Sequence, residues 1–327
     1  MINRKLFAPY LALICAGFAN AQTGLIQTYA GSGNLGFSGD GGPAVSANIA
    51  TPFGLALDAN GNLYIAVAEN QRVRVVNSSS GIITTVAGGG TGGNGGLATS
   101  AELTGPCDVK LDASGDLYLS DSCITASAGS GGGQTSGPAR VWRVDAVTGI
   151  ITTVAGGGTS GFGGDGGPAT SALLSIPAGL AVDASGDIYI ADSGNNRIRR
   201  IDGVTGIITT VAGNGAAAFA GDGGPATAAS LNDPVGIAID GAGNLYVADT
   251  LNNRVRLINA ADRVAVKVSG LPEGTLEALA DKVTAVLANG LGSDTSRTRF
   301  PSNSETNSEP EGEIASPAGK FKLAVVA

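Results

Sequence analysis

One sequence motif recurs four times and limits the folds available to this chain. It runs from an aspartate, through a glycine turn and a tyrosine segment, to an arginine segment. The copies read DANGNLYIAVAENQRVR at 58–74, DASGDLYLSDS at 112–122, DASGDIYIADSGNNRIR at 183–199 and DGAGNLYVADTLNNRVR at 240–256. A repeat with a period of this length is typical of folds built from repeated supersecondary units.

Each unit is predicted to hold four short strands. In the first unit these are residues 53–58, 62–67, 72–76 and 82–87, which are rich in Val, Ile, Thr and Tyr and are separated by Gly-containing turns. The third of these strands alternates arginine with β-branched residues, which predicts a half-exposed strand. Four antiparallel strands per unit at this period predict an all-β chain, a β-propeller with four recognisable units.

The two ends of the repeat region suggest how the ring closes. The last unit lacks the IITTVAG segment that follows the arginine strand in the other three units. A similar segment, LIQTYAG at 25–31, stands before the first unit. We expect this N-terminal strand to pair with the last unit, because closure removes exposed sheet edges. The alternative is that 25–31 belongs to an upstream unit that has been lost.

The repeat resembles the NHL-repeat family of β-propellers over about residues 24–259. Residues 177–199 and 234–256 follow the pattern P-x-G-[LIV]-A-[LIV]-D-x-x-G-[ND]-L-Y-[IV]-A-D-x-x-N-x-R-[IV]-R. The linkers FGGDGGPATSA and FAGDGGPATAA resemble those of the long-linker bacterial and extracellular subtype. The resemblance implies a binding or scaffolding module, with some lyases and lactonases among relatives. Most relatives have six blades, whereas this chain has four units.

The first 21 residues are predicted to be a signal peptide. Arg4 and Lys5 precede an apolar run at 6–18, and Ala19-Asn20-Ala21 has the small-residue pattern of a cleavage site. We therefore expect a secreted or periplasmic protein with no membrane insertion after the signal is removed. The alternatives are an uncleaved anchor or a buried strand.

The repeat region is expected to end at residue 259. Residues 260–291 are interpreted as a strand followed by an amphipathic helix, because apolar residues at 275–288 recur at helical spacing. Residues 292–319 are rich in Ser, Asn, Glu and Pro and are predicted to be a disordered linker. Residues 320–327 are interpreted as a terminal strand, which makes the tail a small α/β or partly disordered segment.

Charge and composition exclude several function classes. The formal net charge is −8 and no Lys/Arg cluster is present, which argues against a nucleic-acid partner. The chain contains no histidine, which excludes Ser-His-Asp and Cys-His catalysis and histidine-ligated zinc.

Two loops carry the same set of polar residues and are the candidate binding site. An aspartate, an amide pair and an arginine on one short loop could hold a ligand carboxylate or a sugar. The alternative is structural, because an aspartate and an arginine five residues apart can tie their own loop together, and recurrence favours that role. The residues are Asp192, Asn195, Asn196 and Arg197, and Asp249, Asn252, Asn253 and Arg254.

The glycine-rich linkers are the candidate calcium loops. The motif GDGGPA occurs at 39–44, 164–169 and 221–226, with GNGGLA at 93–98. One carboxylate per loop falls short of the six to eight oxygens that calcium takes, so a packing turn is the favoured interpretation. We therefore predict no cofactor, with calcium kept as the alternative.

The second unit differs from the others by an insertion, SCITASAGSGGGQTSGPA at 122–139. Pairing Asp112 with Leu117 across the turn would place Cys107 opposite residue 122. A disulfide between Cys107 and Cys123 is therefore predicted, with two free buried thiols as the alternative. In a blade of this topology the insertion, the linkers and the Asp/Asn/Arg loops share one face, which we call the long-loop face.

The sequence favours an exported, non-catalytic binding or scaffold propeller. Its ligand would be a protein or a glycan bound on the long-loop face. The first alternative is a metal-dependent lactonase-like or lyase-like enzyme, for which Glu69 and Glu102 are the non-repeated acids. The second alternative is a fragment of a larger propeller protein.

Overall fold

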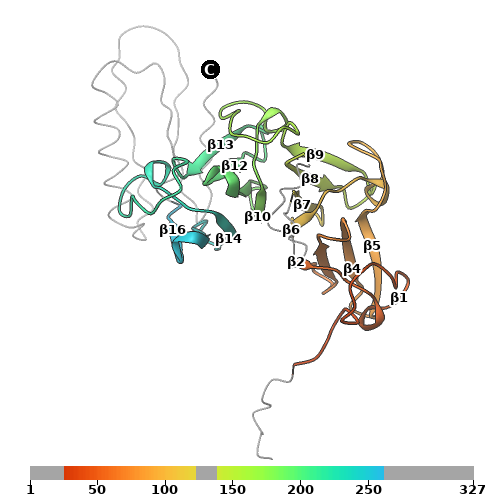
Figure 1. Ribbon diagram of the computed structural model, residues 1–327. Coiled ribbons are helices and arrows are strands. Elements are labelled where there is room, and N and C mark those ends of the chain that lie inside the picture. The colour runs from red at the N-terminus through yellow and green to blue at the C-terminus, as the bar shows by residue number, and fades with distance from the viewer. Residues whose placement is uncertain (1–25, 123–137, 261–327) are drawn as a thin grey trace, which may run out of the picture. The chain divides into compact units, whose positions relative to one another are not determined.

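The computed structural model describes residues 26–122 and 138–260 (Figure 1). These residues form four antiparallel sheets, and in each sheet the principal strands follow chain order as a meander. We call the sheets the first to fourth units. The first holds β2 (Pro52–Leu57), β3 (Leu63–Val67), β4 (Arg72–Val76) and β5 (Ile82–Gly88), with the two-residue β1 (Gly42–Pro43) added beside β5.

The other three units repeat this plan. The second holds β6 (Pro106–Leu111), β7 (Leu117–Asp121), β8 (Arg140–Val144) and β9 (Ile151–Ala155). The third holds β10 (Pro177–Val182), β11 (Ile188–Asp192), β12 (Arg197–Ile201) and β13 (Ile208–Ala212). The fourth holds β14 (Pro234–Ile239), β15 (Leu245–Asp249) and β16 (Arg254–Ile258). The prediction of an all-β chain built from propeller blades is confirmed.

Short 3-10 turns occur at two positions in the repeat. The linker before each unit contains one: η1 (Ala44–Ser46), η2 (Ala98–Ser100), η3 (Ala169–Ser171) and η5 (Ala226–Ala228). The loop after the tyrosine strand contains one in the third and fourth units, η4 (Ser193–Asn195) and η6 (Thr250–Asn252).

The predicted hairpin turns are present and are built by aspartates. Asp58 accepts hydrogen bonds from the backbone N–H of Asn60 (2.8 Å) and Asn62 (2.9 Å), so its carboxylate stabilises the turn between β2 and β3. The equivalent Asp183 accepts from Ser185 and Asp187 in the third unit. This local hydrogen bonding explains why the Asp-x-x-Gly signal recurs with each tyrosine strand.

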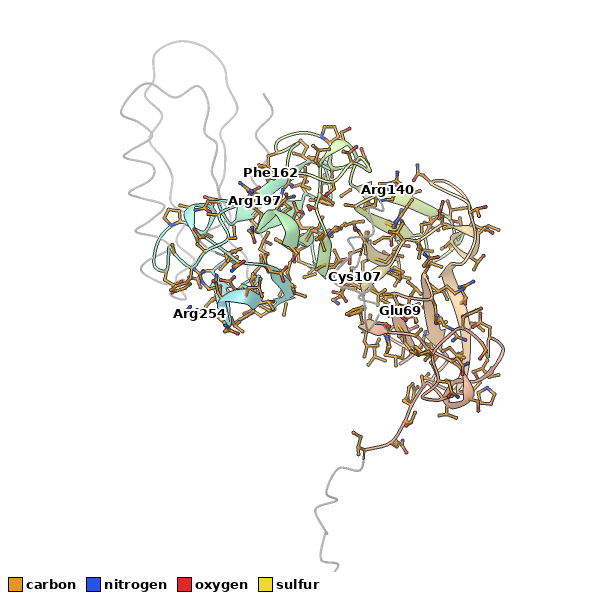
Figure 2. The ribbon with its side chains drawn as sticks, in the orientation of Figure 1. Glu69, Cys107, Arg140, Phe162, Arg197 and Arg254 are labelled. Atoms are coloured by element: carbon orange, nitrogen blue, oxygen red, sulfur yellow. The ribbon has the colours of Figure 1, made fainter. Side chains whose placement is uncertain are left out.

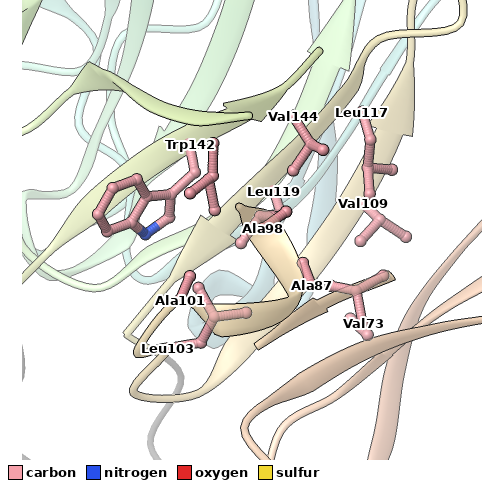
Figure 3. Close-up of a cluster of buried hydrophobic side chains, with 12 residues drawn as sticks. Val73, Ala87, Ala98, Ala101, Leu103, Val109, Leu117, Leu119, Trp142 and Val144 are labelled. Carbon is pink, nitrogen blue, oxygen red and sulfur yellow. The ribbon is translucent and has the colours of Figure 1, made fainter. Parts of the chain in front are cut away.

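The hydrophobic core lies between neighbouring units. Figure 3 shows one cluster, in which Val73 and Ala87 of the first unit pack with Val109, Leu119 and Trp142 of the second. A second cluster joins the second and third units, and a third joins the third and fourth. Each sheet thus buries an apolar face against the next sheet in the chain.

The first strands of successive units lie side by side, and glycine allows the close approach. A Cβ on Gly179 in β10 would lie 2.4 Å from the carbonyl oxygen of Val235 in β14. A Cβ on Gly54 in β2 would lie 2.4 Å from the Asp108 carboxylate in β6. The contacts of β2 with β6 and of β10 with β14 therefore require a residue without a side chain, whereas β6 carries Asp108 at the same position beside β10.

The structure does not form the N-terminal closure that the sequence predicts. Residues 26–30 are described but form no strand, and the fourth unit has three strands. Just after this segment, Gly31 donates to the carbonyl of Ala44 (2.9 Å) and Ser32 donates to that of Ala47 (2.8 Å). These bonds tie the N-terminal segment to the linker of the first unit.

Two finer predictions about strands were wrong. Leu111 pairs with Leu117, one residue earlier than predicted, and a bulge then places Pro106 opposite Asp121. Cys107 is buried within that bulge, and the predicted pairing of Cys107 opposite residue 122 was therefore wrong. The arginine strand is also less exposed than predicted, because Arg74 in β4 and Arg199 in β12 are fully buried.

Several predicted segments lie outside the described residues. These are the signal peptide, most of the insertion with Cys123, and the tail from residue 261. The Cys107–Cys123 disulfide and the domain boundaries at the two ends therefore stay predictions. In the part of the chain that is described, no helix has the length and apolar character needed to cross a membrane.

The close approach of the first strands generates a stability prediction. Replacing Gly179 by Ala places a methyl group against the β14 backbone and should destabilise the protein by about 1–3 kcal/mol. The control is Gly241→Ala, where a Cβ meets nothing within 4 Å. Chemical denaturation of both variants measures the difference. Equal stability of the two variants would contradict the proposed packing.

Candidate functional site

The aspartate of the predicted binding loop is buried within its own unit. The carboxylate of Asp192 accepts hydrogen bonds from the backbone N–H of Ser175 (2.8 Å) and the side-chain amide of Asn195 (2.8 Å). It also pairs with Arg199 at 3.1 Å. The sequence predicted a pair with Arg197, five residues along. That partner was wrong, because Arg199 in the middle of β12 reaches back to the carboxylate.

Arg199 is surrounded by acceptors from the linker. Its guanidinium pairs with Asp165 at 2.7 Å and donates to the carbonyls of Gly163 and Leu173. Asp165 also accepts from the hydroxyl of Thr210 in β13 at 2.6 Å. The linker carboxylate therefore joins the arginine strand to the outermost strand of its unit. We call Asp165, Asp192, Arg199 and Thr210 the buried arginine cluster.

The cluster recurs in the first unit, where the buried aspartate is replaced, and in the fourth unit, which has no outermost strand among the described residues and therefore no threonine partner. In the first unit Arg74 pairs with Asp40, and Asp40 accepts from Thr85 (2.6 Å), while Val67 stands where the buried aspartate would be. In the fourth unit Arg256 pairs with Asp222 at 2.6 Å and with Asp249 at 3.2 Å. The linker aspartates that raised the question of calcium are thus partners of arginine. Among the described residues, no three His, Cys, Asp or Glu side chains form a group that could hold a metal ion.

In the first, third and fourth units, the first arginine of the arginine strand stacks on a linker phenylalanine. The guanidinium carbon of Arg197 lies 3.7 Å from the centre of the Phe162 ring, and Figure 2 shows the two residues together. Arg72 lies over Phe37 at 3.9 Å, and Arg254 lies over Phe219 at 3.7 Å. Stacking of this kind is favourable and occupies the face of the guanidinium.

The loop asparagines also form hydrogen bonds with neighbouring backbone groups. Asn195 donates to the carbonyl of Gly161, and Asn252 donates to that of Ala218, both in the linkers. Asn196 and Asn253 have left-handed backbones, with φ of 52° and 54°, which asparagine tolerates. Asn196 also accepts from the backbone of Asp233 at 2.9 Å. The eight predicted residues are thus brought together in two copies, and their contacts favour the structural interpretation.

The second unit departs from the cluster at three positions at once. Thr91 stands where the other linkers have phenylalanine, Asn94 where they have aspartate, and Trp142 where the strands have the buried arginine. The buried Trp142 indole donates to Asp121 at 3.3 Å. Asn94 still accepts from the backbone of Thr153 (2.6 Å), so the link to the outermost strand remains. The arginine and the linker aspartate that form the ion pair in the other units are both replaced here by uncharged side chains.

Asp121 is consequently a buried carboxylate without an arginine partner in the described part of the chain. It accepts from the backbone N–H groups of Thr104 (2.9 Å) and Gly105 (2.8 Å) and from the Trp142 indole. Burial is the largest influence on this group and raises its pKa above the usual 3.8.

A cavity of about 170 Å³ opens beside these residues. Glu102, Thr104, Arg140 and Trp142 contribute to its lining. Arg140 lacks the stacking phenylalanine of its counterparts, and its guanidinium carbon lies 5.3 Å from the centre of the Trp142 ring. Within 26–122 and 138–260, no acceptor forms a hydrogen bond with its guanidinium. Figure 2 shows Arg140 on the second unit.

Polar residues also replace small ones on the first strand of this unit. Asp108 takes the position of Gly54 and Gly179, and its carboxylate accepts from the backbone of Leu180 at 2.9 Å. Lys110 pairs with Asp108 at 2.6 Å. This pair was not predicted, although Asp108 and Lys110 stand where the other copies of the first strand have glycine and alanine. The non-repeated acids Glu69 and Glu102 are exposed and belong to different units.

The comparison with known proteins identifies the repeat. Two segments, residues 174–201 and 231–256, match the model of the NHL repeat, and they cover most of the third and fourth units. The chain is an NHL-repeat protein. The resemblance inferred from the Asp-x-x-Gly and Arg-x-Arg patterns is confirmed.

Relatives of this NHL-repeat protein are longer than the chain itself. It is 29% identical over 245 residues to Protein SUPPRESSOR OF QUENCHING 1, chloroplastic, of Arabidopsis thaliana, covering 72% of this chain and 22% of that protein. It is 36% identical over 100 residues to NHL repeat-containing protein 2 of Bos taurus, covering 30% and 14%. The chain therefore spans less than a quarter of the length of either relative.

One solved structure with a similar fold is an auxiliary nutrient binding protein from Bacteroides ovatus. The TM-score is 0.45 at 20% identity, and the match covers 64% of this chain and 48% of that chain.

The buried arginine cluster of this NHL-repeat protein predicts a large effect of one substitution. Arg199→Met leaves Asp165 and Asp192 without their cation and should destabilise the protein by about 3–5 kcal/mol. Arg200→Met, on the same strand, removes a partly exposed arginine and should cost about 1 kcal/mol or less. Urea denaturation of both variants measures the difference. Similar losses for the two would show that the cluster does not stabilise the unit.

The buried Asp121 predicts a pH dependence with a definite sign. Its raised pKa means that the folded state holds the proton more tightly than the unfolded chain. Its contribution to stability therefore falls as the pH rises from about 3.8 through the raised pKa. The free energy of unfolding of Asp121→Asn should rise relative to wild type over this interval.

The control for that measurement has the opposite sign. Hydrogen bonds from the Thr205 backbone lower the pKa of Asp202, so its contribution is present above pH 3.8 and is lost as the pH falls through the lowered pKa. Asp202→Asn should therefore be less stable than wild type near neutral pH and approach it in acid. If both variants followed the wild-type profile in parallel, the assignment of these shifts would be wrong.

Proposed function

We propose that this NHL-repeat protein is an exported, non-catalytic binding protein whose ligand contacts the second unit. The observation that carries the proposal is Arg140 beside the cavity. The guanidinium carbons of its counterparts Arg72, Arg197 and Arg254 lie 3.7–3.9 Å from the centres of phenylalanine rings. The guanidinium carbon of Arg140 lies 5.3 Å from the centre of the Trp142 ring. A guanidinium placed in this way is suited to receive an acceptor from a ligand.

The concentration of departures in one unit supports the same assignment. A structural feature should recur in each repeat, whereas a binding site is needed once. Thr91, Asn94 and Trp142 on the linker side and Asp108 with Lys110 on the first strand all belong to the second unit. Repeat proteins commonly place function in residues that differ between copies of one scaffold.

The chemistry of the lining indicates the kind of ligand. Arginine presents a planar fork that binds carboxylates through two parallel hydrogen bonds, and Thr104 and Glu102 add polar groups. A cavity of about 170 Å³ is smaller than typical small-molecule pockets. The site would therefore receive one carboxylate-bearing group of a larger ligand, either an acidic sugar of a glycan or an acidic residue of a protein.

The long-loop face is the surface that such a ligand would approach. The loop asparagines donate to the linkers in the third and fourth units, so these loops and the linkers lie on one side of each sheet. Export through the signal at 1–21 and a Cys107–Cys123 disulfide beside the insertion form part of this proposal. A fragment of a larger binding protein is compatible with the partial coverage of the relatives.

The enzyme alternative requires carboxylates from several units to converge. The described residues bring the candidate acids Glu69 and Glu102 to different units, both exposed, and Asp108 is paired with Lys110. We therefore propose binding without turnover and without a bound cofactor.

Equilibrium binding tests the proposal. Isothermal titration would compare the mature protein with two probe sets, galacturonic acid oligomers and acidic peptides. One set should bind, and Arg140→Gln should weaken that binding about tenfold or more, because each factor of ten corresponds to about 1.4 kcal/mol. The matched control, Arg197→Gln, should bind as wild type does.

Two results would contradict the proposal. The first is binding that is equal for wild type and Arg140→Gln, or absent for both probe sets. The second is calcium-dependent hydrolysis of a lactone by the wild-type protein, which would support the enzyme alternative.

A further inference from the structure

The fourth unit contains a groove, which we call the slot, beside β16, where the other units have their outermost strand. β16 faces linker residues 221–224 across a groove of about 350 Å³. In the third unit the equivalent space is filled by β13, which pairs with β12 on one side. On its other side, Gly166 donates to the carbonyl of Ile208 (2.8 Å) and Ile208 donates to that of Gly167 (3.0 Å). The slot therefore presents backbone groups on both edges to an incoming strand.

The linker aspartate of the fourth unit lacks one of its usual partners. Asp40 and Asp165 each accept from a threonine hydroxyl on the outermost strand of their unit, Thr85 and Thr210 respectively, at 2.6 Å. The side chain of Asp222 pairs with Arg256 but is 65% exposed, against 34% for Asp40 and 37% for Asp165. The slot therefore needs a strand that carries a threonine at a defined position.

Residues 26–30 have that sequence, and residues 26–29 are exposed. The segment 25–31, LIQTYAG, aligns with IITTVAG, so Thr28 corresponds to Thr85 and Thr210. Ile26 is 101% exposed, whereas its counterparts Ile83, Ile151 and Ile208 are all 0% exposed. An apolar residue at full exposure, in a position that is fully buried in three other copies, indicates a missing contact.

The hydrogen bond that follows this segment matches the one that follows an outermost strand. Gly31 donates to Ala44 at the first-unit linker, just as Gly213 at the end of β13 donates to Ala226 at the fourth-unit linker (both 2.9 Å). Residues 26–30 thus hold the place of an outermost strand belonging to a unit that precedes the first unit.

The exposed ends of the repeat region indicate a second copy as the source of that unit. Within residues 26–122 and 138–260 of one chain, no strand fills the slot and no strand pairs with the segment. Leu55 on β2 is 55% exposed and Val255 on β16 is 71% exposed, while Ile198, the counterpart of Val255, is 0% exposed. These two faces are of the kind that pack together between successive units of the chain. One head-to-tail contact with another molecule would cover the faces and fill the slot.

We propose that residues 26–30 of one copy form the outermost strand of the fourth unit of a second copy. The register of β12 with β13, transferred to β16, pairs Arg256 with Thr28 and Ile258 with Ile26. Thr28 then donates to Asp222, and Ile26 is buried. The contact is heterologous, so it generates a closed ring or a larger assembly of copies. This inference is independent of the ligand proposed for the second unit.

Cross-linking of two tagged chains tests the proposal. One chain carries Thr28→Cys and the other carries Asp222→Cys, and the two are expressed together and oxidised. The expected product is a covalent dimer that contains one chain of each kind, identified by intact mass. The matched control replaces Thr28→Cys with Val147→Cys, a cysteine on an exposed turn of the second unit, and should give no such dimer.

Light scattering gives an independent readout. The wild-type protein should have a mass of at least two chains, and Ile26→Asp should reduce it to one chain while leaving the circular dichroism spectrum of the sheets unchanged. The proposal is overturned if the wild-type protein is a monomer, or if the mixed chains give no covalent dimer. It is also overturned if the cross-link forms only within a single chain that carries both cysteines, because that result shows self-closure.

Discussion

The ion pair between a buried arginine and a linker carboxylate is the interaction on which three of the four units depend. A fully buried guanidinium is costly unless each of its donors has a partner. Arg199 meets this condition through two carboxylates and two carbonyls, and Asp165 extends the network to the hydroxyl of Thr210. The cluster adds side-chain bonds to the backbone hydrogen bonds that join the linker, the arginine strand and the outermost strand. Its recurrence explains why the linker and strand motifs appear together in the sequence.

The same requirement explains why the second unit can differ. Removing the arginine alone would leave a buried charge without a partner, so a tolerated change must alter several positions together. Trp142 fills the space, Asn94 keeps one hydrogen bond without a charge, and Thr91 removes the ring on which the first arginine would stack. Arg140 is left beside a cavity with no acceptor among the described residues. A change in the structural cluster thus creates the group that we propose as the binding residue.

The sequence predicted those features that local chemistry determines. Strand positions, the aspartate turns and the four-unit all-β plan follow from period, β-branched residues and glycine. Contacts between distant residues were not predictable in the same way: Arg199 and Asp165 are 34 positions apart, and no local pattern shows that Phe162 lies under Arg197. The bulge near Cys107 shifted the predicted pairing, because an extra residue in one strand leaves no local signal. The sequence predicted a strand at 25–31 that the described residues do not form, because its pairing depends on how separate units or copies meet.

Hydrogen exchange at three equivalent amides tests the central claim most directly. Gly41, Gly95 and Gly166 each donate a 2.8 Å hydrogen bond from the linker to the outermost strand of their unit. If the arginine–carboxylate pair holds the linker in place, Gly41 and Gly166 should exchange slowly. Gly95, whose unit lacks the pair, should exchange faster. Equal exchange rates at the three amides, or slowest exchange at Gly95, would contradict the account.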